Sequence, residues 1–139
     1  HNLVPDMITW GVLALGCQSL DEAKVLLEGM ELSGHTLNPV IAGSFLGNAC
    51  CGNKIDYILE IMQLMMYKRI RPTEHIYTIL DKYKAATEDK LKYNKKSRAY
   101  RNPKFRTKFE VFKNRYEKMQ ALNGRDKLHA HLKERRTIN

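Results

Sequence analysis

The sequence predicts an all-α fold in which helical hairpins repeat along the chain and form a short α-solenoid. When the sequence is shifted by 35 residues, Asp21 falls on Asp56 and Met30 falls on Met65. A fixed period of this length is typical of stacked helix-turn-helix units, which cannot bury their apolar faces alone. Within residues 55–66, apolar side chains recur at spacings of three and four, and no stretch of the chain keeps the strict alternation of a strand.

The first hairpin is predicted from the residues that bound its helices. Asp6 can cap a first helix that ends near Gly16. Ser19 and Glu22 form a capping box at the start of a second helix, in which Ser19 accepts from the backbone and Glu22 reaches back. That helix is expected to end at Gly34, because glycine tolerates the left-handed turn that closes many helices.

The second hairpin has similar boundaries. Asn38 is a good cap for a third helix, and Pro39 suits the first helical position. Gly52 begins the next turn, and a fourth helix with an apolar face follows it. Thr73 then caps a fifth helix, which we expect to run through about Ala86.

The remainder of the chain is expected to form a basic extension. Residues 87–102 are polar and basic without apolar periodicity, which predicts a linker or a clamp that a partner orders. A basic amphipathic helical extension follows at residues 103–139, with Asn102 as the cap of its helix. The predicted organisation is therefore a repeat region at residues 5–86, containing two hairpins and the first helix of a third, followed by this linker and extension.

One face of the extension helix carries a stripe of large apolar residues at steps of three and four. Its members are Phe105, Phe109, Phe112, Tyr116 and Met119. Helical spacing favours a packing face, directed at the last repeat helix or at a partner protein, over a platform that stacks bases. The other faces carry the candidates for contact with the phosphates of a polyanion, which are Lys104, Arg106, Lys108, Lys113 and Arg115.

Charge is strongly segregated along the chain. Residues 1–86 hold seven Lys and Arg against nine Asp and Glu, whereas residues 87–139 hold seventeen against six. The formal net charge of +9 therefore comes from the C-terminal part. Such asymmetry indicates an arm that binds a polyanion, and the aromatic residues of this part favour nucleic acid over a merely solvated surface.

The sequence contains few features that support other classes of function. There is no Gly-rich phosphate loop or nucleophile elbow, so no enzyme, catalytic residue or cofactor is expected. His129 and His131 lack nearby ligands at metal spacing, and no metal site is expected. The three cysteines favour a reduced compartment. No apolar run approaches the roughly 20 residues of a membrane span.

Several segments resemble a known repeat family. The sequence DMITW at residues 6–10, LDEA at 20–23 and LLEGM at 26–30 follow one another as in a pentatricopeptide repeat. A second copy runs from Pro39 to Thr73 and has the family's 35 residues. The resemblance covers residues 5–86.

The second copy departs from the family's pattern at two positions. Ala42 stands where an aromatic residue is usual, and Arg69 stands where glycine is usual. The first copy is also three residues shorter between Trp10 and Asp21 than the second copy is over the matching stretch.

The resemblance implies which residues would read RNA bases. In this family the fifth residue of a repeat's first helix acts together with the last residue of the repeat. These positions pair Gly11 with Asn38 and Gly43 with Thr73, and Thr78 takes the fifth position in a partial third repeat. Base reading needs polar edges, which glycine lacks, so we expect little sequence selectivity.

The resemblance further implies a non-catalytic RNA-binding adaptor of the mitochondrial matrix. Its RNA would be tRNA or rRNA precursors, and it would act beside an RNA-processing enzyme or a ribosomal assembly. The alternative is a protein–protein scaffold that holds such an enzyme, or a mitochondrial ribosome component, in which the basic residues are secondary.

Overall fold

The computed structural model describes residues 7–124, and this part of the chain is all-helical, as predicted. Its helices are α1 (Met7–Leu15), α2 (Leu20–Leu32), α3 (Pro39–Cys51), α4 (Ile55–Tyr67), α5 (Glu74–Tyr93), α6 (Arg98–Arg101) and α7 (Pro103–Leu122). None of these helices is long and apolar enough to cross a membrane. The predicted cap at Asp6, the histidines at 129 and 131, and the extension beyond residue 124 lie outside the described residues.

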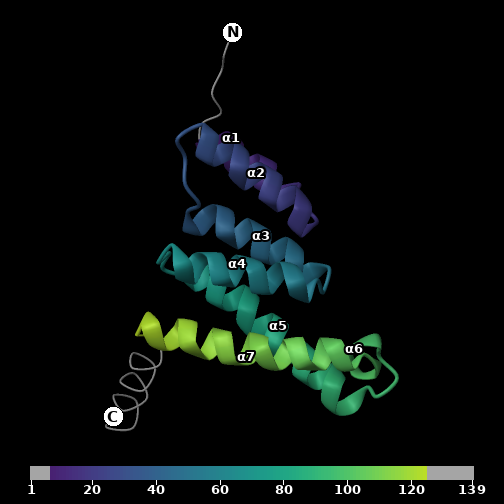
Figure 1. Cartoon of the computed structure of the whole chain (residues 1–139). Coiled ribbons are helices and arrows are strands. Elements are labelled where there is room, and N and C mark those ends of the chain that lie inside the picture. Colours follow the sequence, from purple (N-terminus) through teal and green to yellow (C-terminus); the bar gives the residue numbers. More distant parts are fainter. Residues whose placement is uncertain (1–6, 125–139) are drawn as a thin grey trace.

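The helices form three pairs that stack on one another, as Figure 1 shows from α1 and α2 at one end to α5 and α7 at the other. Helix α3 contacts both α1 and α5, while α4 contacts both α2 and α7. The first helices of the pairs therefore form one row and the second helices form another. Helix α7 completes the third pair, so the described part of the extension folds back on the repeats and shares one hydrophobic core with them.

The predicted caps are present at the helix starts. Asn38 Oδ1 accepts from the backbone N–H of the third helical residue at 2.9 Å, and Thr73 Oγ1 does the same at 3.3 Å. Ser19 Oγ also accepts from the backbone of Glu22. The Glu22 carboxylate reaches back as expected, but it accepts from the Ser19 hydroxyl rather than from the backbone. These bonds satisfy backbone N–H groups in the first turn, which have no hydrogen-bond partner within the helix.

Two turns 35 residues apart close their helices in the same way. Gly34 has φ of +82°, and Arg69 at the matching position has φ of +55°. After each, the next backbone N–H donates to the carbonyl of the matching methionine, Met30 or Met65, at 2.8 Å. Both methionines are fully buried. The sequence period of 35 is thus also a period of backbone geometry and of core packing.

Side chains of α3 and α4 donate hydrogen bonds to backbone carbonyls at the end of α1 and in the turn after it. The Asn48 side-chain amide donates to the carbonyls of Ala14, Leu15 and Cys17 at 3.0–3.2 Å. The buried Tyr57 hydroxyl also donates to the Cys17 carbonyl, at 3.0 Å. Carbonyls at a helix end have no partner within the helix, so these bonds fix the stacking of one pair on the next.

The structure corrects the expected linker at residues 87–102. Helix α5 does not end near Ala86 but continues to Tyr93, and residues 98–101 form α6. The reason is that Thr87 is buried and Leu91 packs against the core, which extends the buried face of α5 at steps of four. A threonine within this stripe concealed the periodicity in the sequence.

We predict that Arg69→Gly raises the free energy of unfolding by about 0.5–1 kcal/mol. Relief of left-handed strain, about 1–2 kcal/mol, exceeds the additional backbone entropy that glycine loses on folding, about 0.5–1 kcal/mol. Gly34→Ala should have the opposite effect, because an added Cβ meets no atom within 4 Å and only the backbone strain acts. Urea unfolding followed by circular dichroism measures both changes. A loss of stability in Arg69→Gly would contradict the matching of the two turns.

Candidate nucleic-acid interface

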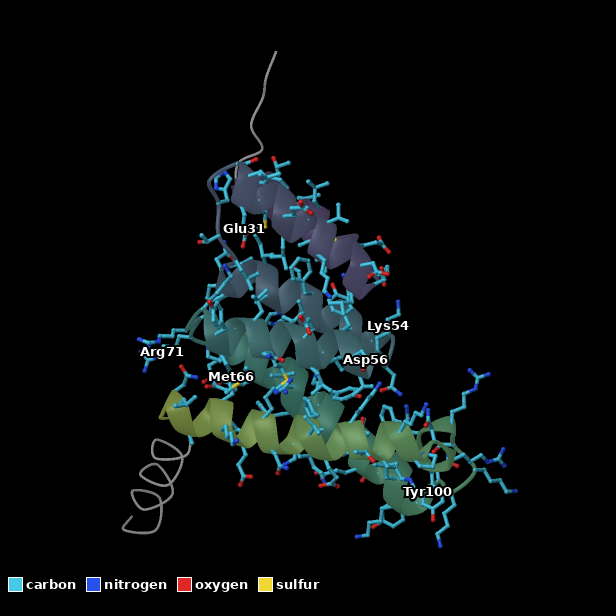
Figure 2. All side chains as sticks on the ribbon, viewed as in Figure 1. Glu31, Lys54, Asp56, Met66, Arg71 and Tyr100 are labelled. Atoms are coloured by element: carbon cyan, nitrogen blue, oxygen red, sulfur yellow. The ribbon has the colours of Figure 1, made fainter. Side chains whose placement is uncertain are left out.

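A dense cluster of positive charge lies where α5 ends and α7 begins. Residues 90–108 contain nine Lys and Arg and no Asp or Glu. Eight of these cations have exposed side chains, and together we name them the basic corner: Lys90, Lys92, Lys95, Lys96, Arg98, Arg101, Lys104 and Arg106. Figure 2 shows nitrogen-tipped side chains projecting from the ribbon around Tyr100, which lies among them.

The backbone of the basic corner is held in place by caps and by one buried side chain. Ser97 Oγ accepts from the Tyr100 backbone N–H at 3.2 Å and starts α6. Asn102 Oδ1 accepts from the first turn of α7 at 3.0 and 3.3 Å. Between these caps, Ala99 is buried against the core. The cations therefore extend from ordered helix ends that contact one another through α6.

The cations of the basic corner have no ion-pair partner among the residues that the structure describes. The ion pairs in residues 7–124 join Lys68 to Glu31, Lys84 to Glu88, Lys108 to Asp56, and Lys113 to Glu110. None of them includes a member of the basic corner. Clustered unpaired cations raise the local positive potential, which attracts phosphates.

The five predicted phosphate candidates divide into two groups. Lys104 and Arg106 belong to the basic corner. The other three are held by groups of the chain itself, and their contact with RNA stays a prediction. Lys108 Nζ lies 2.8 Å from the carboxylate of Asp56, and Lys113 Nζ lies 2.8 Å from that of Glu110. Arg115 donates to the backbone carbonyl of Leu59 at 2.9 Å.

The predicted apolar face of the extension is buried within the chain. All five members are at most 8% exposed. Phe109 and Phe112 lie edge-on to Tyr83 of α5, with ring centroids 6.3 and 5.3 Å apart. The Tyr116 hydroxyl donates to the Tyr77 carbonyl at 3.3 Å. This face packs on the repeat helices, the first of the two predicted targets, and is not free to hold a separate protein.

Two of the predicted base-reading residues lie together. Gly43 and Thr73 line one open pocket of about 620 Å³ beside α3 and α5, with Ser44, Asn48 and His75. A Cβ added at Gly43 would lie 3.6 Å from the His75 ring. The glycine therefore leaves the polar groups of this pocket accessible but contributes no side chain to it.

The remaining base-reading candidates are Gly11, Asn38 and Thr78. Gly11 on α1 has no atom within 4 Å of an added Cβ. The Asn38 side-chain oxygen is used in capping α3. Thr78 is exposed, and its hydroxyl donates to the Glu74 carbonyl at 2.9 Å. Their role in reading RNA remains a prediction.

Most of the basic corner lies outside the candidates that the sequence predicts. The missed members are Lys90, Lys92, Lys95, Lys96, Arg98 and Arg101. A sequence signal for them exists, namely the run of nine cations without an acidic residue. A linker is expected at residues 87–102, and cations on an irregular linker would not form a common surface. The run of cations therefore does not by itself predict a site.

Neither a group of metal ligands nor a reactive Cys50 thiol is present in the described part of the chain. Within residues 7–124, no three His, Cys, Asp or Glu side chains are grouped to hold a metal ion. Burial, together with the neighbouring Cys51, raises the pKa of the Cys50 thiol to about 12. This thiol is therefore protonated at neutral pH and is a poor nucleophile.

Comparison with known proteins gives no relative: no family model, curated protein or solved structure matches the chain.

We predict that Thr73→Ala lowers the free energy of unfolding by about 1 kcal/mol, because it removes the cap of α5. Thr73→Ser should retain most of the stability, since its hydroxyl can accept the same bond from the backbone of Ile76. Thermal unfolding of both variants measures the difference. Equal melting temperatures for the alanine and serine variants would contradict the capping role. The Thr73 hydroxyl would then be available to a ligand in the pocket beside α3 and α5.

Proposed function

We propose that the protein binds RNA through the basic corner and acts as a non-catalytic adaptor. The observation that supports this most is the set of eight exposed cations, none ion-paired to a described residue, on connected helix ends. Lys and Arg that neutralise phosphates release condensed counterions, and this release drives sequence-independent binding to nucleic acid. A polyanion is therefore the ligand that fits this surface.

The resemblance to pentatricopeptide repeats supports the same proposal for the remainder of the chain. The matched turns at Gly34 and Arg69 and the matched caps at Asn38 and Thr73 are what a short α-solenoid of this family would have. On that basis the protein works in the mitochondrial matrix on tRNA or rRNA precursors. Its protein partner would be an RNA-processing enzyme or a ribosomal assembly.

Little sequence selectivity is part of the proposal. Phosphate contacts position an RNA but do not read its bases. The two pairs that would read bases each contain a glycine, at Gly11 and Gly43, which has no side-chain donor or acceptor. The identity of the RNA would then be set by its shape or by the protein partner.

A second candidate function is a protein-binding scaffold, and an exposed apolar surface on α1 and α2 favours it. Val12, Leu13 and Val25 are 63%, 46% and 71% exposed. Leu13 and Val25 line an open, mainly apolar pocket of about 480 Å³. Exposed apolar surface of this kind is typical of protein contacts. This surface is at the opposite end of the stack from the basic corner, so the two functions are separable.

We predict that removing four cations of the basic corner weakens binding to unrelated RNAs alike. The corner variant replaces Lys95, Lys96, Arg98 and Arg101 with alanine. Affinity for single-stranded RNA, measured by fluorescence anisotropy at several salt concentrations, should have a log–log slope of roughly −0.7 per phosphate neutralised. The corner variant should flatten this slope.

The matched control removes four exposed cations elsewhere, namely Lys24, Arg71, Lys82 and Lys118. Both variants have the same net charge, so a difference between them reports the position of the charge. Equal effects of the two variants would contradict a site at the basic corner. If the corner variant binds RNA like the parent, the RNA function at the basic corner fails. Loss of a co-purifying protein when the exposed Val12 and Val25 are replaced by aspartate would then favour the scaffold function.

A further inference from the structure

Two tyrosines lie among the cations of the basic corner. Tyr93 is the last residue of α5 and is 74% exposed. Tyr100 lies in α6 and is half-buried (Figure 2). The other tyrosines of α5, at positions 77 and 83, are buried against α7. The ring of Tyr93 therefore takes little part in the core and is available to a ligand.

Each of these rings has a cation of the basic corner over one face, which leaves the other face for a base. Lys92 Nζ lies 5.2 Å from the centre of the Tyr93 ring. The Arg106 guanidinium carbon lies 5.2 Å from the centre of the Tyr100 ring. A nucleotide that stacks its base on one of these rings would bring its phosphate within reach of a cation. Aromatic platforms combined with a positively charged path are the usual means of binding single strands.

We propose that the basic corner takes single-stranded RNA, with one base stacked on Tyr93 and a neighbouring nucleotide against Tyr100 and Arg106. This inference rests on the proposed RNA function and specifies its ligand. In a duplex the bases are stacked on one another and their faces are not accessible to a side chain. A duplex therefore offers the corner phosphates and 2′-hydroxyls but nothing for the tyrosine rings.

The experiment compares three labelled ligands of one length by fluorescence anisotropy. They are a mixed-sequence single-stranded RNA of about 15 nucleotides, its duplex with the complementary strand, and an abasic strand that keeps only the sugar–phosphate backbone. We expect the single strand to bind more tightly than either of the others. All three should lose affinity with salt, because all three present phosphates.

The variants separate stacking from charge and from folding. Tyr93→Leu should weaken single-strand binding about 5- to 150-fold, the range for losing one stacked base, and should leave binding of the abasic strand unchanged. Tyr93→Phe should bind as the parent does, because stacking needs the ring and not the hydroxyl. The control is Tyr67→Leu, since Tyr67 is also the last residue of its helix and is 84% exposed, but lies outside the basic corner.

Each result has one meaning. Equal affinity for single strand and duplex, with salt dependence retained, would overturn the inference and leave the proposed RNA function in place. Equal losses in Tyr93→Leu and Tyr67→Leu would also overturn it. If none of the three ligands binds the parent protein at low salt, the proposed function fails together with the inference.

Discussion

The contact between α5 and α7 through aromatic rings is the interaction on which the described structure depends most. Tyr83 lies against Phe109 and Phe112, and Tyr77 lies against Tyr116. Aromatic pairs contribute about 0.5–1.5 kcal/mol each beyond the burial of their area. Through this contact the end of α5 and the beginning of α7 converge. Without it, the cations of residues 90–106 would be spread along a chain with no common surface.

Charge has two separate roles along α7. The cations in the middle of the helix attach it to α4, since Lys108 pairs with Asp56 and Arg115 donates to Leu59. The Lys108 and Asp56 side chains are 42% and 68% exposed, and exposed pairs contribute only about 0–1 kcal/mol. Burial of the aromatic face therefore provides most of the attachment. The cations at the start of α7 remain available for a ligand.

Local signals predicted most of the fold. The caps at Asn38, Thr73 and Asn102 and the aromatic face of α7 were readable from the sequence, because caps and helical periodicity are properties of short segments. The length of α5 was not readable, since its buried face passes through Thr87, whose burial is set by tertiary contacts. The site was predicted only in part for the same reason. Which cations remain without an ion pair depends on the residues that α7 packs against. Those residues are distant in sequence, so local sequence patterns do not reveal them.

We expect RNA to contact the basic corner rather than the pocket beside α3 and α5. Backbone amide chemical shifts of the labelled protein, followed by nuclear magnetic resonance during titration with single-stranded RNA, test it directly. The largest changes should fall within residues 90–106, and α7 should stay docked. Changes confined to the surroundings of Gly43 and Thr73, with residues 90–106 unaffected, would contradict it.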